Sequence, residues 1–276
     1  MLLFPNAKIN IGLFITEKRP DGYHNIESVF YPAPVKDALE AVIDLTIPDG
    51  EIQFMTSGNE IPGDATNNLC LKVHREISKH YPLPGIKAQL HKLIPTGAGL
   101  GGGSADAAFF INLLNSLCQL NISQSRREEI AAQIGSDCSF FIQNKPAFCY
   151  GRGELSKPIT LINLKHLFLV TIYPNIHIST QEAYTGVVPT KPEFDLQTLN
   201  ELPLREWKGV VKNDFEDSLF PKYPKLAMLK DELYQSGAVY AAMSGSGSTV
   251  YGLFESKTVL VNSLQSENII YNGLME

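Results

Sequence analysis

The chain has 276 residues, of which 44% are hydrophobic and 19% are charged, a composition typical of a globular protein with a sizeable core and not of a fibrous or disordered one. Its formal net charge of -6 argues against broad contact with nucleic acid or an anionic membrane, because both need clustered lysines and arginines. A chain of this length suits two domains, and we expect them to be segments 1–155 and 156–276, divided after the Gly151-Arg152-Gly153 turn.

Targeting signals are weak in this sequence. The apolar start, Met1 to Phe4, runs at once into Pro5 and is too short for a signal peptide, and no stretch of about 18 apolar residues suggests a membrane span. The four cysteines form no CxxC pair and have no histidine at metal-ligand spacing. We therefore expect a cytoplasmic protein with reduced thiols and no membrane partner, either a monomer or a weak homodimer.

The first part of the chain has the pattern of an antiparallel sheet. Apolar and polar residues alternate over 2–16, and the turn signal at 19–22 predicts a hairpin. Short apolar segments broken by prolines and glycines follow over 29–54. A helix is predicted over 67–81, capped by Asn67 or Asn68 and stopped by Pro82, and a strand over 86–94.

Two helices are predicted next, joined to that strand by a glycine-rich loop over 95–103. The first covers 104–117, and the second covers 123–134 with a serine cap and an end at Gly135. Segment 139–150 has a strand-like composition.

The second half predicts a strand at 167–173, a polar connection and a helix at 225–236. A strand that runs into a glycine and serine turn over 238–248, a strand at 249–254, a helix and a last strand follow. The order strand-helix-strand-strand-helix-strand favours a ferredoxin-like layer. The predicted fold class is therefore α+β, with an N-terminal mixed sheet carrying helices and a C-terminal ferredoxin-like layer.

The loop between Pro95 and Asp106 carries the strongest chemical signal. Its clustered glycines allow a ligand to approach the backbone closely, and the helix that follows presents free N–H groups and a partial positive charge. This combination favours a phosphate site, which would need no basic patch.

Other interpretations of the loop are weaker. Gly97, Gly99 and Gly102 satisfy the dinucleotide fingerprint, but the acidic residue expected about 20 positions later would fall near Ile122, between two helices. No GK[ST] sequence closes a P-loop, and protein-kinase motifs are absent. A tight strand-to-helix crossing with no ligand also remains open.

The string GLGGGSADA resembles the ATP-binding motif of the galactokinase, homoserine kinase, mevalonate kinase and phosphomevalonate kinase (GHMP) superfamily. Further segments resemble motifs of one branch, which acts on a cytidine diphosphate substrate. They are Pro5–Asn10 with Arg19–His24, Gly135–Cys138, Asn213–Glu216 and Met243–Ser248. The resemblance spans nearly the whole chain and implies a two-domain GHMP-kinase architecture.

The resemblance implies that ATP phosphorylates the 2-hydroxyl of a cytidine diphosphate-linked methylerythritol, in the non-mevalonate route to isoprenoid precursors. The residues that it assigns to ATP are Pro95, Gly97, Gly99, Leu100, Gly101, Gly102, Gly103, Ser104, Ala105 and Asp106. No carboxylate cage for a resident metal is evident, so we expect Mg²⁺ to arrive with ATP.

Asp137 and Lys8 are the catalytic candidates. Asp137 follows the end of a predicted helix, where the helix dipole gives an acid no advantage, although it could simply cap the next segment. Lys8 lies in an apolar strand, where an ammonium needs a compensating partner unless it points to water from an edge strand. The resemblance makes Asp137 the base and pairs Lys8 with it.

The substrate candidates lie on a turn and at two further places in the chain. Tyr23 and His24 follow the turn at 19–22, and by resemblance they stack on cytosine and read its edge, with Tyr184 as a second stacking face. Asn10 and Thr180 complete the set, and Asn10 would orient the hydroxyl. Ordinary packing is the alternative for each aromatic residue.

The glycine and serine residues of 243–248 could form a second anion-holding turn or could simply close a hairpin. Three rival functions also remain open: another kinase of the same superfamily, a non-catalytic nucleotide sensor, and a nicotinamide oxidoreductase.

Overall fold

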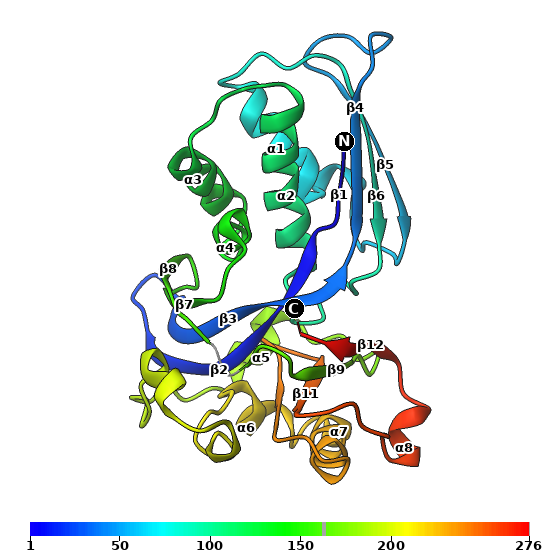
Figure 1. The fold of residues 1–276 in the computed structure, drawn as a ribbon. Coiled ribbons are helices and arrows are strands. Elements are labelled where there is room, and N and C mark those ends of the chain that lie inside the picture. The colour runs from blue at the N-terminus through cyan, green and yellow to red at the C-terminus, as the bar shows by residue number, and fades with distance from the viewer. Residues whose placement is uncertain (162–163, 276) are drawn as a thin grey trace. The chain divides into compact units, whose positions relative to one another are not determined.

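The computed structural model describes residues 1–161 and 164–275 and divides into two compact units (Figure 1). The first unit combines Met1–Ala7, Val35–Thr96 and Gly101–Lys145, and the second combines Lys8–Pro34, Gly97–Leu100 and Pro146–Glu276. Each unit is thus assembled from three separate segments. The boundary near residue 155, which the sequence predicts between two continuous domains, stays a prediction.

The sheet of the first unit is mixed. Its strand order is β1 (Leu2–Leu3), β4 (Ala38–Ile43), β6 (Ile86–Lys92) and β5 (Ile52–Gly58), with β4 antiparallel and β5 parallel to β6. Along β6, buried and exposed residues alternate strictly, so one face of the strand packs inward. The helices of this unit lie on one side of the sheet (Figure 1).

Those helices are α1 (Leu69–Ser78), α2 (Gly102–Leu117), α3 (Gln124–Ile134) and α4 (Cys138–Gln143), preceded by a 3₁₀ turn at Ala65–Asn67. The caps predicted from sequence are confirmed, because Asn68 accepts from the N–H of Cys70 and Ser123 from that of Arg126.

The strand-like prediction for 139–150 is wrong over its first half. Residues 138–143 form α4, which packs against α2 and α3, and β7 (Ala147–Gly151) begins only afterwards. Three consecutive residues of this helix, Phe140, Phe141 and Ile142, are all buried. The sequence therefore shows a continuous apolar segment and no helical period. A short apolar run of this kind does not distinguish strand from helix.

The predicted N-terminal hairpin is confirmed as β2 (Asn6–Lys18) and β3 (His24–Lys36), two strands of a sheet in the order β2-β3-β7-β8, where β8 is Leu155–Pro158. The N–H of Arg19 donates to the carbonyl of Tyr23 at 2.8 Å and closes the turn. Residues 6–15 of β2 are all buried, and they place polar side chains inside the protein.

The second sheet of the second unit has the order β10 (Tyr240–Met243), β11 (Val250–Phe254), β9 (Phe168–Ile172) and β12 (Ile269–Leu274), with every neighbouring pair antiparallel. Together with α7 (Pro224–Gln235) and α8 (Asn262–Gln265), the chain order is strand-helix-strand-strand-helix-strand. In the sheet, β9, the first of these strands in chain order, lies between the third, β11, and the fourth, β12. This arrangement confirms the predicted ferredoxin-like layer.

The connection between β9 and α7 is more ordered than the sequence predicts. It contains α5 (Thr180–Thr185), 3₁₀ turns at Leu196–Glu201 and Leu204–Glu206, and α6 (Phe215–Leu219). These pieces span six residues or fewer, too short to show a helical period in the sequence.

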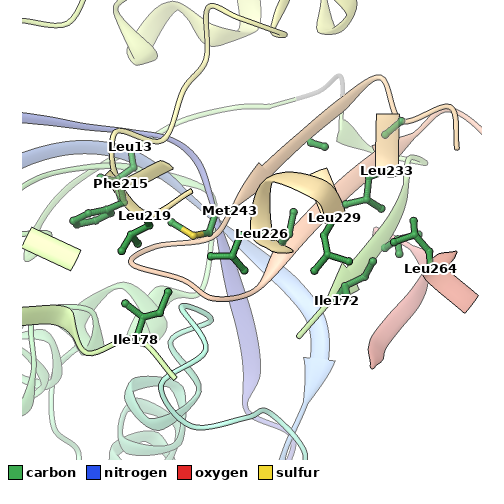
Figure 2. Close-up of a cluster of buried hydrophobic side chains, with 14 of the residues drawn as sticks. Leu13, Ile172, Ile178, Phe215, Leu219, Leu226, Leu229, Leu233, Met243 and Leu264 are labelled. Atoms are coloured by element: carbon green, nitrogen blue, oxygen red, sulfur yellow. The ribbon is translucent and has the colours of Figure 1, made fainter. Parts of the chain in front are cut away.

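An apolar cluster joins helices and strands of the second unit (Figure 2). Leu226, Leu229 and Leu233 lie at helical spacing on α7 and are at most 2% exposed. Together with Phe215 of α6 and Met243 of β10 they form part of one buried core. Because Met243 is the last residue of β10, the cluster holds the end of this strand in place, and the glycine and serine turn begins directly after it.

Candidate active site

The glycine-rich loop adopts backbone conformations that few other residues tolerate. Gly97, Gly99 and Gly101 have φ values of 71°, 78° and 70°, in the left-handed region. Gly101 is the N-cap of α2, which therefore begins two residues earlier than predicted. The loop thus delivers the free N–H groups of a helix start, as a phosphate site requires.

Two neighbouring glycines have different roles. A Cβ on Gly102 would lie 2.7 Å from Cγ2 of Ile94, so this glycine serves close packing. A Cβ on Gly103 would meet only Cδ1 of Leu69 at 3.7 Å, and Gly103 is exposed at the start of α2. Packing therefore explains Gly102 but not Gly103.

The other predicted ATP residues differ in exposure. Leu100, Ala105 and Asp106 are buried, whereas Pro95 and Ser104 are half-buried.

A cavity of about 420 Å³ lies within the first unit beside this helix start. Phe54, Leu69 and Leu71 give it apolar walls, and Gly103 and Asp106 of α2 also line it. The volume is in the usual range for small-molecule sites, and the mixture of apolar walls with a few polar groups is typical of them.

One edge of the cavity carries a buried ion network that the sequence prediction missed. The Lys92 ammonium donates to Asp37 and, at 2.7 Å, to Oδ2 of Asp106, and all three side chains are at most 4% exposed. The alternation of β6 contains a signal for it, because Lys92 occupies an inward position after Ile86, Ala88 and Leu90. A cation on an apolar face requires a charged partner.

Lys8 and Asn10 lie side by side within the second unit. The Lys8 ammonium donates to Oδ1 of Asn10 and lies 4.4 Å from the ring centroid of Phe30. Nδ2 of Asn10 donates to Ser28 Oγ at 2.9 Å. Lys8 is 3% exposed, so the interpretation that it points to water from an edge strand is wrong.

The turn after β10 holds one part of the glycine loop within this same unit. Ser244 Oγ donates to the carbonyl of Gly99 at 2.9 Å and accepts from the N–H of Asn10. Nδ2 of Asn213 donates to the carbonyls of Met243 and Gly245 at 2.8 and 2.9 Å. A Cβ on Gly99 would lie 2.0 Å from the Ser244 carbonyl oxygen, which explains the glycine there. The turn joins β10 to β11 and also supports the loop.

The predicted substrate residues gather around the hairpin turn and α5. Tyr23 is 57% exposed, and the guanidinium of Arg152 lies 5.0 Å from its ring centroid. The ring of His24 stacks on that of Tyr184, with centroids 4.8 Å apart and planes at 16°. His24 thus lies over Tyr184, while exposed Thr180 begins α5 and Ser179 caps it.

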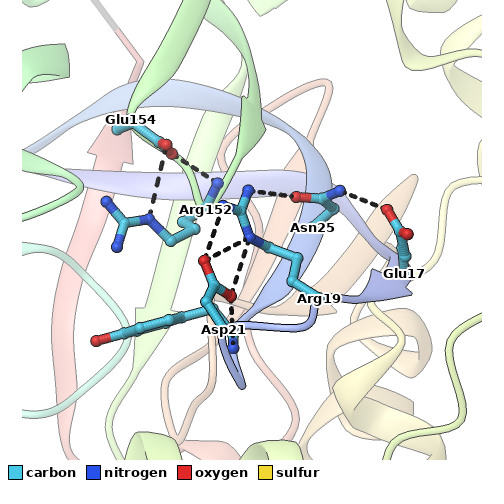
Figure 3. A network of polar contacts seen from close by, with 7 residues as sticks. Glu17, Arg19, Asp21, Asn25, Arg152 and Glu154 are labelled. Carbon is cyan, nitrogen blue, oxygen red and sulfur yellow. Dashed lines mark hydrogen bonds and ion pairs between the residues drawn. The ribbon is translucent and has the colours of Figure 1, made fainter.

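A polar network fixes the turn that carries Tyr23 (Figure 3). The single Nε–H of Arg19 is shared between the two oxygens of the Asp21 carboxylate, and Nη2 donates to the same carboxylate. Nη1 of Arg19 donates to Asn25, and Asn25 donates to Glu17. The hydrogen bond from Arg19 lowers the pKa of Asp21. Burial lowers the pKa of His24, and the Lys18 charge adds to the effect. A neutral imidazole is thus favoured in the stack.

Asp137 lies in the first unit, at the N-cap position of α4. Its side chain makes no hydrogen bond to the first turn of this helix, so the alternative that it caps the next segment is wrong. Capping therefore gives no account of this carboxylate.

The sequence matches two family descriptions, "GHMP kinases N terminal domain" over residues 68–152 and "GHMP kinases C terminal" over 192–266. It is 48% identical to the 4-diphosphocytidyl-2-C-methyl-D-erythritol kinase of Cytophaga hutchinsonii, and the match covers 93% of each chain. It is also 48% identical to the enzyme of the same name from Bacteroides thetaiotaomicron, over 98% of this chain and 97% of that one. This chain belongs to the 4-diphosphocytidyl-2-C-methyl-D-erythritol kinase family. A crystal structure of a 4-(cytidine 5'-diphospho)-2C-methyl-D-erythritol kinase is similar, with a TM-score of 0.79 and 27% identity over 93% of this chain and 91% of that one.

Members of this family are kinases of the GHMP type, and ATP is their phosphate donor. Within the first unit, the cavity offers apolar walls and the start of α2 offers free N–H groups, which is the chemistry that a nucleotide requires. Among residues 1–161 and 164–275, no group of three or more histidine, cysteine, aspartate and glutamate side chains could hold a metal ion. None of the helices in the described part of the chain has the length and apolar character needed to cross a bilayer.

Proposed function

We propose that this protein transfers the γ-phosphate of ATP to the 2-hydroxyl of 4-diphosphocytidyl-2-C-methyl-D-erythritol, in the non-mevalonate route to isoprenoid precursors. The observation that carries the proposal is the 48% identity to kinases of this name over almost the whole chain. The substrate is a small soluble metabolite, so we place the enzyme in the cytoplasm, as a monomer or weak homodimer.

ATP would bind with its nucleoside in the 420 Å³ cavity and its phosphates at the N-terminus of α2. The exposed backbone at Gly103 supports this placement, since side chains there would obstruct the approach of a phosphate. Mg²⁺ would arrive with the nucleotide, because its usual protein ligands are one or two carboxylates together with substrate phosphates.

For the chemistry, we assign Asp137 as the base that accepts the proton of the attacking hydroxyl. Phosphoryl transfer otherwise requires positioning and stabilisation of charge on the moving group. Lys8 would supply that charge, and the hydrogen bond from Lys8 to Asn10 supports a role for Asn10 in orienting neighbouring groups. Lys8 and Asn10 are both buried in β2, so their side chains have few alternative rotamers.

For the cytidine moiety, we assign Tyr23 as the stacking platform, because its ring is exposed and Arg152 supports it. His24 and Tyr184 would form the neighbouring wall as a stacked pair. Thr180 lies at the start of α5, close in sequence to Tyr184, and is exposed for a polar contact.

The test is an ADP-release assay with purified protein, MgATP and one acceptor at a time: 4-diphosphocytidyl-2-C-methyl-D-erythritol, mevalonate or homoserine. We expect turnover with the cytidine diphosphate acceptor alone, and mass spectrometry should find one added phosphate on it. Turnover with mevalonate or homoserine instead would replace the proposal with another kinase of the superfamily. ATP binding without turnover of any acceptor would favour a sensor.

A further inference from the structure

Asp106 lines the 420 Å³ cavity and has one side-chain oxygen without a hydrogen-bond partner among the described residues. The residue is 3% exposed and lines the cavity, and its Oδ2 accepts from Lys92 at 2.7 Å. Its Oδ1 has no hydrogen-bond partner among the described residues. Buried polar atoms are nearly always hydrogen-bonded, so this oxygen indicates a group that binds there.

Both oxygens of the other carboxylate in the network, that of Asp37, are hydrogen-bonded. Oδ2 of Asp37 accepts from Lys92, and Oδ1 of Asp37 accepts from the N–H groups of Leu93 and Ile94 at 2.6 and 2.8 Å. Both carboxylates thus hold Lys92, but only Asp106 has an oxygen without a hydrogen-bond partner among the described residues. Asp37 anchors the end of β6, while Asp106 lies on α2, which also carries Gly103 into the cavity.

The charges of the network restrict what can bind at this oxygen. The Lys92 ammonium lies 2.7 Å from the same carboxyl group and opposes a second cation there. Two carboxylates against one ammonium oppose a phosphate equally. A neutral N–H or O–H donor is repelled neither by the ammonium nor by the carboxylates. The apolar walls at Phe54, Leu69 and Leu71 suit a nucleoside that carries such donors.

We propose that Asp106 is a specificity-determining residue of the nucleotide site, whose Oδ1 accepts a hydrogen bond from the nucleoside part of ATP. The donor is the amino group of adenine or a ribose hydroxyl, since both offer the same chemistry. Lys92 positions the carboxylate through its hydrogen bond to Oδ2. The inference rests on the proposed function in one respect, that the cavity takes ATP.

The test compares wild-type protein with Asp106→Asn by calorimetric titration at about pH 8.5, above the raised pKa of Asp106, where Oδ1 is an acceptor. Because Lys92 still needs an acceptor, the amide oxygen should turn to Lys92 and the amide nitrogen to the cavity, which replaces an acceptor with a donor. The ligands are ATP, 2'-deoxy-ATP, 3'-deoxy-ATP and purine riboside triphosphate, which lacks the amino group. We expect the substitution to weaken ATP about 10- to 100-fold, the usual effect of an unsatisfied buried group.

The analogue without the relevant donor should bind wild type and Asp106→Asn with nearly equal affinity. If that analogue is purine riboside triphosphate, the donor is the adenine amine, and if it is a deoxynucleotide, the donor is the ribose. Asp37→Asn is the matched control, because it also removes a carboxylate from Lys92 but no cavity oxygen. It should lower Tm and leave the affinity ratios among the four nucleotides unchanged.

Equal weakening of all four nucleotides by Asp106→Asn would overturn the inference. Should that variant fail to fold, wild type decides alone, because equal affinity for all four nucleotides would exclude a nucleoside donor at Asp106. The proposed function fails independently: selective nucleotide binding without phosphorylation of the cytidine substrate overturns the function and leaves Asp106 in its role. Normal phosphorylation of the cytidine substrate with equal affinity for all four nucleotides supports the function and overturns the role of Asp106.

Discussion

At the scale of single residues, Asp137 occupies the N-cap position of a helix without capping it. Asp137→Asn keeps the shape of the side chain and removes the proton acceptor. We expect kcat to fall about 10²- to 10⁴-fold, the usual contribution of a general base, with ATP affinity unchanged. Single-turnover measurements at saturating ATP and acceptor would check this, and near-normal turnover in the folded variant would remove Asp137 as the base.

Lys8 offers a second prediction at this scale. Lys8→Met retains the apolar stem beside Phe30 and removes the charge. We expect kcat to fall about 10²- to 10³-fold, because a group that stabilises transition-state charge is lost. If Lys8 and Asp137 serve the same step, the double variant should lose much less than the product of the two single losses. Strictly multiplicative losses, measured under the same single-turnover conditions, would assign them to separate steps.

At the scale of elements, the start of α2 contains a matched pair of glycines. Gly103→Ala adds a methyl group that contacts only Leu69 and projects where phosphates would approach, so we expect a raised KM for ATP and an unchanged Tm. Gly102→Ala adds the same methyl group 2.7 Å from Ile94, so Tm should fall. Kinetics and thermal melts on both variants would separate the two roles, and an unchanged KM in Gly103→Ala would argue against phosphates at this helix start.

The hairpin turn between β2 and β3 gives the second prediction for an element. Tyr23 is exposed, so Tyr23→Ala should leave Tm unchanged and weaken binding of the cytidine substrate by about 1–3 kcal/mol, the value of one stack between a base and an aromatic ring. Tyr23→Phe keeps the ring and should bind normally. Titrations with substrate and with ATP would test this, and equal losses for the two ligands in Tyr23→Ala would contradict a role in cytidine binding.

At the scale of the whole molecule, the buried ion network links folding to pH. Burial raises the pKa of Asp106 to about 7 from 3.8, although the Lys92 charge opposes the shift. Between about pH 4 and pH 7 the folded protein therefore binds more protons at this site than the unfolded chain does. Its contribution to the free energy of unfolding is full below about pH 4 and is lost as the pH rises through 7.

Asp106→Asn removes this titration. We expect the free energy of unfolding of wild type, relative to the variant, to be larger at pH 5 than at pH 8, as measured by urea denaturation at each pH. A difference between wild type and variant that stays constant across this range would show that Asp106 keeps an ordinary pKa.

Sequence alone determined the features that depend on neighbouring residues. The caps at Asn68 and Ser123, the hairpin turn and the ferredoxin-like element order follow from local patterns, and the structure confirms them. The string GLGGGSADA identified the superfamily by its resemblance to the ATP-binding motif, and the left-handed φ values of Gly99 and Gly101 explain the glycines at those two positions. Asp137, Lys8 and the cytidine residues stay predictions.

Only the tertiary structure decided the features that depend on contacts between distant parts of the chain. The fold of 138–143 as a helix follows from its packing against α2 and α3, since an apolar run without period does not specify its own backbone. Asp37, Lys92 and Asp106 are separated by 55 and 14 positions and come together only through the packing of α2 on the sheet. The unpartnered oxygen of Asp106 exists for the same reason, because burial and hydrogen bonding are properties of the packed chain.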